Sequence, residues 1–155
     1  MKKKLILLVM LVSMLALSLT FLSCEEDTKL ELNGTTWVAS FSKAELADYM
    51  DYEVSTLDFM LSLLGGTVNF PIAIMKLEFT SDKDFTMYYN SGLNTFSNTV
   101  TWDSPQKGTY TIDGDDVTLK ISGYSPYTCP VDGNTLTMTE ENNQGKKITL
   151  KFKKQ

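Results

Sequence analysis

The segment from residue 108 to residue 119 reads Gly108-Thr109-Tyr110-Thr111-Ile112-Asp113-Gly114-Asp115-Asp116-Val117-Thr118-Leu119. Apolar and polar side chains alternate on both sides of Asp113-Gly114, and a period of two residues is typical of a β-strand with one buried face. Glycine readily adopts the positive backbone angles of a tight hairpin turn, so Asp-Gly between two such runs is a strong turn signal. The segment therefore predicts two antiparallel strands joined by a short turn.

The same pattern recurs along most of the chain. A second turn is predicted at Val131-Asp132-Gly133-Asn134, and the strand after it places Leu136 and Met138 on one face. Further alternating runs lie near residues 35–41, 75–79, 85–89, 96–102 and 148–152. Together these runs predict about eight or nine short strands, mostly joined by hairpins.

One segment early in this region has a helical period instead. Ser42 and Glu45 have the spacing of a capping box, which satisfies free backbone N–H groups in the first helical turn. Gly65-Gly66 supplies the left-handed conformation that commonly ends a helix. The apolar residues between these signals recur at intervals typical of a helix: Leu46, Met50, Leu57, Met60, Leu61 and Leu64. We therefore predict one amphipathic helix over about 43–64, after the first strand.

A sheet built from one-sided strands must bury its apolar face against itself or against the helix. Closure into a barrel achieves this and leaves no unpaired edge strand. A two-sheet sandwich would satisfy the same alternation, but the succession of hairpins favours the barrel. The predicted fold class is mainly β: an antiparallel up-and-down barrel of about eight strands with one amphipathic helix after the first strand.

The first 23 residues have the composition of an export signal. Lys2-Lys3-Lys4 precede an apolar run from Leu5 to Leu22, which ends at Ser23. A basic start, an apolar middle and a small residue before the cleavage site are the features that export machinery recognises. Two alternatives remain open: an uncleaved membrane anchor, and an ordinary signal peptide with a cysteine nearby.

Phe21-Leu22-Ser23-Cys24 resembles the lipobox of bacterial lipoproteins. The resemblance implies that residues 1–23 are a lipoprotein signal peptide and that Cys24 is diacylated on sulfur, which attaches the protein to a membrane. Two or three acyl chains give a stable anchor, whereas one binds reversibly. Glu25-Glu26-Asp27 is also similar to the acidic tract that sends some Gram-negative lipoproteins to the outer face of the outer membrane. We therefore expect a cell-envelope protein, lipid-anchored to the outer membrane and either periplasmic or surface-exposed.

Cleavage before Cys24 would remove 23 of 155 residues and leave 132, a length suited to one compact domain. Residues 24–33 are mostly polar and are predicted to be a tether, and residues 34–155 are predicted to be the barrel domain. The leader contains three of the 14 basic residues and none of the 19 acidic ones, so the mature chain has a formal charge of −8. This charge argues against nucleic acid as a partner, because phosphate binding needs concentrated positive charge.

Histidine and arginine are absent, and every basic side chain is lysine. Without histidine, the usual general base, the commonest metal ligand and the Ser-His-Asp triad are all missing, so we expect a protein that is not an enzyme and that holds no metal or cofactor. Without arginine there is no bidentate clamp for phosphate or carboxylate. Cys129 would be the one thiol left after lipidation of Cys24. We predict that it is a small buried apolar residue, since no histidine can activate it.

Asn33-Gly34-Thr35-Thr36-Trp37 resembles the glycine-to-tryptophan opening of lipocalin-type barrels, in which the tryptophan packs across one end of the barrel. The segments 108–119 and 132–138 are similar to the repeated strand-turn-strand phrases of lipocalin-like domains in bacterial lipoproteins. This resemblance implies a barrel that holds a ligand. The early helix is similar in position to the helices of fatty-acid-binding proteins, but the arginine with which those proteins hold a carboxylate has no counterpart here.

The predicted strands place methionine and aromatic side chains on the inward face. The candidate ligand-binding residues are Trp37, Met75, Phe79, Phe85, Met87, Tyr89, Trp102, Tyr110, Met138 and Phe152. These residues could line an adaptable apolar pocket, and they could equally form a filled core. The leading hypothesis is a lipid-anchored envelope protein whose barrel binds a small hydrophobic or amphipathic ligand. The alternative is a structural or interaction module with a filled core that contacts envelope proteins or glycans.

Overall fold

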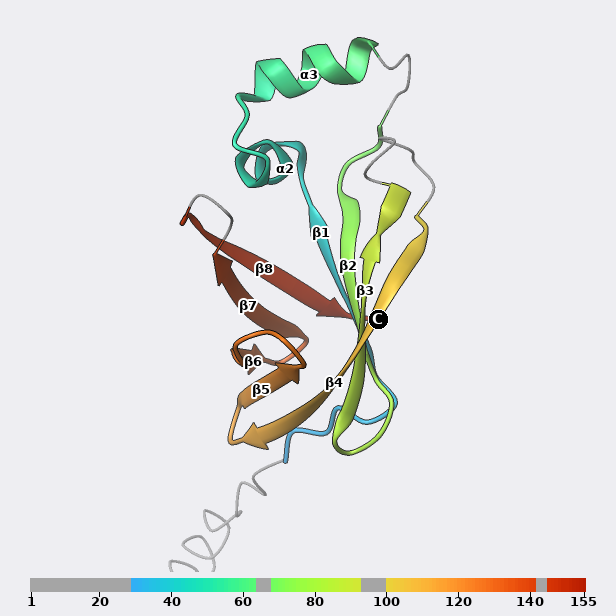
Figure 1. The fold of residues 1–155 in the computed structure, drawn as a ribbon, viewed down its shortest axis with the longest axis vertical. Coiled ribbons are helices and arrows are strands. Elements are labelled where there is room, and N and C mark those ends of the chain that lie inside the picture. The colour runs from blue at the N-terminus through green and yellow to red at the C-terminus, as the bar shows by residue number, and fades with distance from the viewer. Residues whose placement is uncertain (1–28, 64–67, 93–99, 142–144) are drawn as a thin grey trace, which may run out of the picture.

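The computed structural model describes residues 29–63, 68–92, 100–141 and 145–155. Its strands form a closed antiparallel barrel in which all eight strands pair in sequence order and β8 returns to pair with β1 (Figure 1). The strands are β1 (Thr36–Phe41), β2 (Ile72–Phe79), β3 (Asp84–Asn90), β4 (Trp102–Asp113), β5 (Asp116–Ile121), β6 (Tyr127–Asp132), β7 (Thr135–Glu141) and β8 (Lys147–Lys154). The predicted up-and-down barrel is therefore confirmed, and the sandwich is not formed. The export signal, Cys24, Gly65-Gly66 and Phe96 lie outside the described residues.

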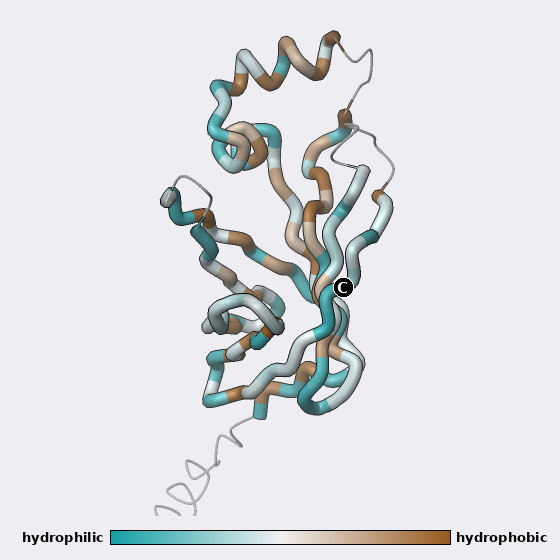
Figure 2. Tube along the Cα trace, in the orientation of Figure 1, coloured by the Kyte–Doolittle hydropathy of each residue, from teal (hydrophilic) through white to brown (hydrophobic). Residues whose placement is uncertain are grey.

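Alternating side chains build the barrel wall, as the sequence predicts. In β5, Val117 and Leu119 are buried whereas Asp116 is exposed, and Figure 2 shows hydrophobic and hydrophilic residues interspersed along the strands. Asp113 pairs with Asp116 across the predicted turn. Gly114 has a φ of 59° there, a conformation that glycine adopts without the steric cost of a side chain.

β2 contains one extra residue relative to β1. Ala39 pairs with Met75, but the next residue, Ser40, pairs with Ala73, so Ile74 is left over as a β-bulge. A bulge bends the strand and redirects its side chains. Ile74 and Met75 are consequently both buried although they are adjacent in the sequence.

A second bulge interrupts β4 opposite β3. Met87 pairs with Gln106 and Tyr89 pairs with Asp103, so two steps along β3 correspond to three steps along β4. Ser104 lies within this bulge and has a φ of 53°. Because a shift of one residue exchanges the two faces of a strand, Asp103 comes to share the face of Tyr89.

The helical segment differs from its prediction. The sequence predicts one helix over 43–64, whereas the structure has two helices there, α2 (Lys43–Tyr49) and α3 (Val54–Leu63). The capping box of Ser42 and Glu45 is present, but α2 ends in a Schellman motif. Asp51 has a φ of 58°, its N–H donates to Asp48 O at 3.3 Å, and the N–H of Tyr52 donates to Ala47 O at 2.8 Å.

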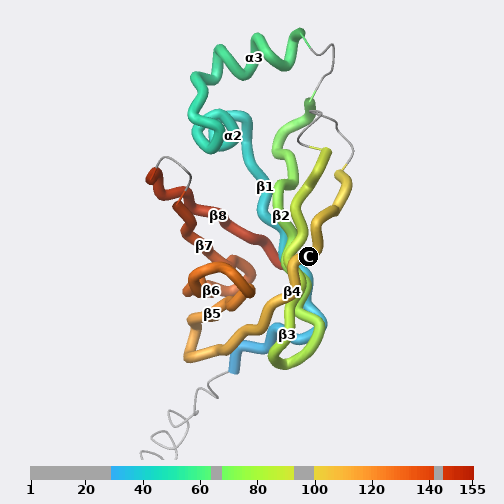
Figure 3. The backbone as a smooth tube through the Cα atoms, in the orientation of Figure 1, coloured from blue at the N-terminus to red at the C-terminus, as the bar shows by residue number. Residues whose placement is uncertain are grey.

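Both helices lie over the same end of the barrel, and the chain enters at the opposite end (Figures 1 and 3). Leu46 and Leu57 are buried, and Lys43 Nζ lies 2.7 Å from Asp58 Oδ1, which joins α2 to α3. Lys146, just before β8, forms an ion pair with Asp48. These contacts hold α2 close to the barrel rim.

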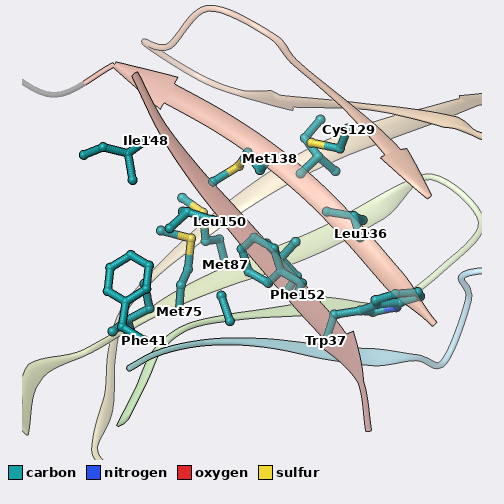
Figure 4. Close-up of a cluster of buried hydrophobic side chains, with 14 of the residues drawn as sticks. Trp37, Phe41, Met75, Met87, Cys129, Leu136, Met138, Ile148, Leu150 and Phe152 are labelled. Carbon is teal, nitrogen blue, oxygen red and sulfur yellow. The ribbon is translucent and has the colours of Figure 1, made fainter. Parts of the chain in front are cut away.

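The barrel interior is filled along much of its length. Figure 4 shows Met87, Leu150 and Phe152 in its middle, with Trp37 toward one end and Phe41 and Ile148 toward the other. The largest fully buried side chains are Trp37, Phe79, Phe85, Phe152, Leu32, Leu57, Leu77, Leu119, Leu136, Met138, Leu150 and Val117. Most of these residues belong to the strands, so a filled core occupies the space that a wider barrel would leave for ligand.

Tight packing and hydrogen bonds hold particular core side chains in place. The ring of Phe85 lies over Gly108, where an added Cβ would come within 2.5 Å of Phe85 Cε1. At the end where the chain enters, Trp37 Nε1 donates to Thr35 Oγ1 at 2.8 Å, and Thr35 Oγ1 donates to Leu32 O. A buried Leu32 therefore closes this end of the barrel.

Candidate functional site

A pocket of about 310 Å³ lies at the barrel end that the helices cover. We call it the helix-end pocket. It is lined by Leu46, Tyr49, Met50, Ile74, Met75, Tyr89, Asn90, Ser91, Asp103, Ser104 and Glu140. These residues come from α2 and its C-cap, β2, β3 with the residue after it, the start of β4, and β7. Both bulges contribute to the lining, and bulges are over-represented at barrel rims and beside functional sites.

One side of the helix-end pocket is apolar. Leu46 and Met50 approach it from α2 and its C-cap, and Ile74 and Met75 approach it from the bulge in β2. Leu46, Ile74 and Met75 are buried. The two methionines are flexible and polarizable, which suits them to ligands of varied shape.

Two tyrosines stand on opposite elements around the pocket. Tyr49 ends α2, and its ring centroid lies 5.4 Å from that of Phe41. Tyr89 pairs with Met75 across β2 and β3. Burial raises the pKa of Tyr89 to about 12, with a smaller contribution from the charge of Glu140. The hydroxyl group of Tyr89 therefore remains protonated at physiological pH and can donate a hydrogen bond.

Glu140 is the ionisable group that β7 directs into the pocket. It follows Leu136 and Met138 at intervals of two residues on the buried face of the strand, and it pairs with Ile148 of β8. Burial raises the pKa of Glu140 above its ordinary value, because a low-dielectric environment disfavours the charged carboxylate. Its charge in turn raises the pKa values of Tyr89 and Tyr127, so these groups lie within electrostatic range of one another.

Asn90 forms a rigid polar corner of the same pocket. Its Nδ2 donates to Ala73 O at 2.7 Å. Its Oδ1 accepts from the backbone N–H of Gly92 at 2.9 Å and from that of Thr101 at 3.0 Å. Since the amide side chain joins β2 to the ends of β3 and β4, Asn90 organises the rim.

The structure places the sequence-predicted ligand-binding residues in three environments: the helix-end pocket, the filled interior and, for Trp102, the outer face. Met75 and Tyr89 line the helix-end pocket. Most of the others are buried in the filled interior: Trp37, Phe79, Phe85, Met87, Tyr110, Met138 and Phe152. Tyr110 donates from its hydroxyl to Ser81 O at 2.8 Å, near the end where the chain enters. Core and pocket were alternative interpretations of these residues, and both environments occur.

The prediction that Trp102 faces inward is wrong. Its ring lies on the outer face, with its centroid 5.4 Å from Lys76 Nζ. The same ammonium group lies 4.2 Å from the ring centroid of Tyr88 and forms an ion pair with Glu78 at 2.6 Å. Counting alternate residues back from Tyr110 would place Trp102 inside, but the bulge at Ser104 exchanges the two faces.

Sequence reasoning missed Tyr49, Asn90 and Glu140. The signal for Glu140 was present, because continuing the alternation Leu136, Met138 by two residues reaches it. An apolar pattern ends at Met138, however, so it does not mark a carboxylate at the next inward position. Tyr49 and Asn90 depend on where a helix and a strand end, and element ends are poorly marked in a sequence.

A second pocket of about 530 Å³ lies at the opposite end, between residues 29–33, Asp82, Tyr110 and Ile112. Leu32 is buried beneath it, and Asn33 Nδ2 donates to Asp82 Oδ1 at 3.0 Å. Residues 29–33 form most of the wall of this pocket, whereas α2 and the strands line the helix-end pocket, which we take as the candidate functional site.

Other chemistry is limited in the described part of the chain. Cys129 is fully buried, as predicted, and burial raises the pKa of its thiol to about 12. The described ranges contain no group of three or more cysteine, aspartate or glutamate residues arranged to hold a metal ion. Neither α2 nor α3 has the length and apolar character needed to cross a bilayer.

No protein-family model, curated protein sequence or solved structure that was compared with this chain matches it.

Proposed function

We propose that this protein is a lipid-anchored lipoprotein of the cell envelope whose lipocalin-like barrel binds a small amphipathic ligand in the helix-end pocket. The observation that carries the proposal is the composition of that pocket, in which apolar side chains of α2 and β2 line the same cavity as Glu140. A concave apolar site with few, well-placed polar groups is the usual form of a small-molecule site.

The volume of the pocket limits the size of the ligand. The pocket has a volume of about 310 Å³. This volume lies at the lower end of the range for small-molecule sites. A molecule with one ring and a short polar arm suits a pocket of this size.

The direction of the pocket supports a role outside the membrane. Residues 29–35 lie at the barrel end opposite α2 and α3 (Figure 3). An anchor at Cys24 would hold that end toward the bilayer, so the helix-end pocket would open away from it. A ligand would then be collected from the aqueous phase.

Blocking the pocket tests the proposal. Met50→Trp places a larger side chain at the C-cap of α2, inside the pocket lining. Leu63→Trp is the matched control, because Leu63 is 69% exposed and lies outside the lining. Equilibrium dialysis against a panel of small ring-containing amphiphiles should detect binding that Met50→Trp abolishes and Leu63→Trp preserves.

The rival function has its own support. Many of the predicted inward residues are packed in a filled core, and three apolar side chains of α3 are exposed: Val54, Phe59 and Leu63. Such a surface is typical of a protein contact. If no amphiphile binds and no small molecule is released when the purified protein is denatured and analysed by mass spectrometry, the interaction module becomes the better account.

A further inference from the structure

We propose that the ligand of the helix-end pocket carries a positively charged amine on an apolar ring or short chain, and that Glu140 accepts this amine. The inference rests on the proposed function and names the chemical class of its ligand. It derives from the position of Glu140, from the tyrosines around it, and from the absence of a lysine partner among the described residues.

Glu140 is set into the pocket by the strand that carries it. It occupies the inward face of β7, continuing the line of Leu136 and Met138. The pocket lining brings it together with Met75 and Tyr89, which belong to strands β2 and β3 on the other side of the barrel. An amine seated among these side chains can reach the carboxylate while its apolar body contacts Met75.

Within the described ranges, Glu140 forms no ion pair. Among the described residues, the lysines in ion pairs are Lys43, Lys76 and Lys146, and their partners are Asp58, Glu78 and Asp48. Burial alone raises the pKa of Glu140, with no opposing effect from a nearby lysine. A half-buried carboxylate in this situation is destabilised when ionised, and a cationic ligand offsets that cost by pairing with it.

The aromatic surroundings favour the same ligand class. Tyr49 and Tyr89 line the pocket, and the charge of Glu140 also reaches Tyr127 of β6. Tyrosine rings attract cations through their negative faces, and aromatic residues around a cation are the usual way to recognise an organic ammonium group. The tyrosine hydroxyls add hydrogen-bonding groups beside the carboxylate.

Other ligand classes fit less well. An anionic ligand would be repelled by Glu140 and by Asp103, which also lines the pocket. A neutral apolar ligand would displace water from Glu140 and offer nothing in exchange. None of the described residues that line the pocket is a lysine, which could balance the charge of an acid.

Three probes of similar shape separate these classes: phenethylamine, 2-phenylethanol and 3-phenylpropanoate. Each has a phenyl ring and a short arm, and they differ in charge. Isothermal titration calorimetry at pH 7 on the full-length chain in nonionic detergent, with detergent-only blanks, measures their affinities. We expect the amine to bind at least about tenfold more tightly than the alcohol, in line with a charge-assisted hydrogen bond, and the acid to bind most weakly.

Two variants assign the effect to one carboxyl group. Glu140→Gln should weaken amine binding at least about tenfold and leave alcohol binding within about twofold. Glu141→Gln is the matched control, since Glu141 is the next residue of β7 and is exposed, and it should leave all three affinities unchanged. Circular dichroism verifies that each variant is folded.

The outcomes distinguish the inference from the function on which it rests. Equal binding of amine and alcohol by the unaltered protein, preferred binding of the acid, or an unchanged amine affinity in Glu140→Gln would each overturn the amine assignment while leaving a ligand-binding pocket. Failure of all three probes to bind would count against the proposed function itself. The comparison on the unaltered protein needs no variant, so it decides the matter even if Glu140→Gln does not fold.

Discussion

Glu140 gives the stability of this protein a specific pH dependence. Burial raises the pKa of its carboxyl group above the value of about 4.3 expected in an unfolded chain. The folded state therefore binds the proton more tightly, and the contribution to stability is full below the unfolded pKa and is lost as pH rises through the folded pKa. We expect Glu140→Gln to be more stable than the unaltered protein at pH 7, by less than about 1 kcal/mol because water screens a half-buried group, and equally stable at pH 3.5.

Urea unfolding of both proteins at the two pH values measures this difference. The charge of Glu140 acts on Tyr49, Tyr89 and Tyr127, and their pKa values are raised, so they stay neutral across this range. Asp103 on β4 also lines the pocket and is unchanged between the two proteins. A Gln variant that is less stable at pH 7 would contradict the assigned cost of burying Glu140.

Individual inward positions could be predicted only where a strand alternates without interruption. Met138 and Phe152 were placed correctly because β7 and β8 pair in regular register. Trp102 was placed on the wrong face because the bulge in β4 adds one residue between it and Tyr110. Ser104, whose φ of 53° marks that bulge, is neither glycine nor asparagine and gave no signal in the sequence.

The two helices also could be predicted only in part from the sequence. The capping box predicts the start of α2, and the apolar stripe predicts the helical segment, but neither pattern predicts the break between α2 and α3. Asp51 adopts the left-handed conformation at this break, where glycine is the expected residue. A helix that ends without glycine or proline is difficult to detect from periodicity.

The break between α2 and α3 can be tested by replacing Asp51, the residue in the left-handed conformation. Asp51→Gly should stabilise the protein by up to about 1 kcal/mol, because glycine adopts the left-handed conformation without steric cost. The gain is limited because glycine also increases the freedom of the unfolded chain. Thermal unfolding measures the change. Asp58→Gly, in the interior of α3, is the matched control and should destabilise the protein, since it also removes the ion pair with Lys43.

A lower stability for Asp51→Gly would show that the carboxylate, and not the backbone angle, holds the end of α2. The orientation of α2 matters for the site, since Tyr49 and Met50 line the pocket at this end of the helix. The same variant should therefore leave ligand binding unchanged if the backbone conformation is retained.

Over the whole molecule, the two barrel ends have different roles. Leu32 and Trp37 are buried at the end where the chain enters, and residues 29–33 form most of the wall of the pocket there, whereas the pocket at the other end is lined by α2 and the strands. The alternation of apolar residues predicted the closed barrel because every strand must bury one face. It could not predict which end stays open, since that depends on how α2 rests on the rim and on two bulges.

The difference between the two barrel ends matters for function only if the end at which the chain enters is the end attached to the membrane. We expect Cys24→Ala to release the protein from membranes into the soluble fraction. The thiol is the point at which the acyl chains would be attached, and without these chains the protein has no lipid anchor. Cys129→Ala is the matched control, since that thiol is fully buried, and it should stay with the membrane. Ultracentrifugation of lysed cells, followed by immunoblotting, measures the distribution. Retention of Cys24→Ala in the membrane fraction would rule out the lipid anchor and remove the reason to expect that the helix-end pocket faces away from the bilayer.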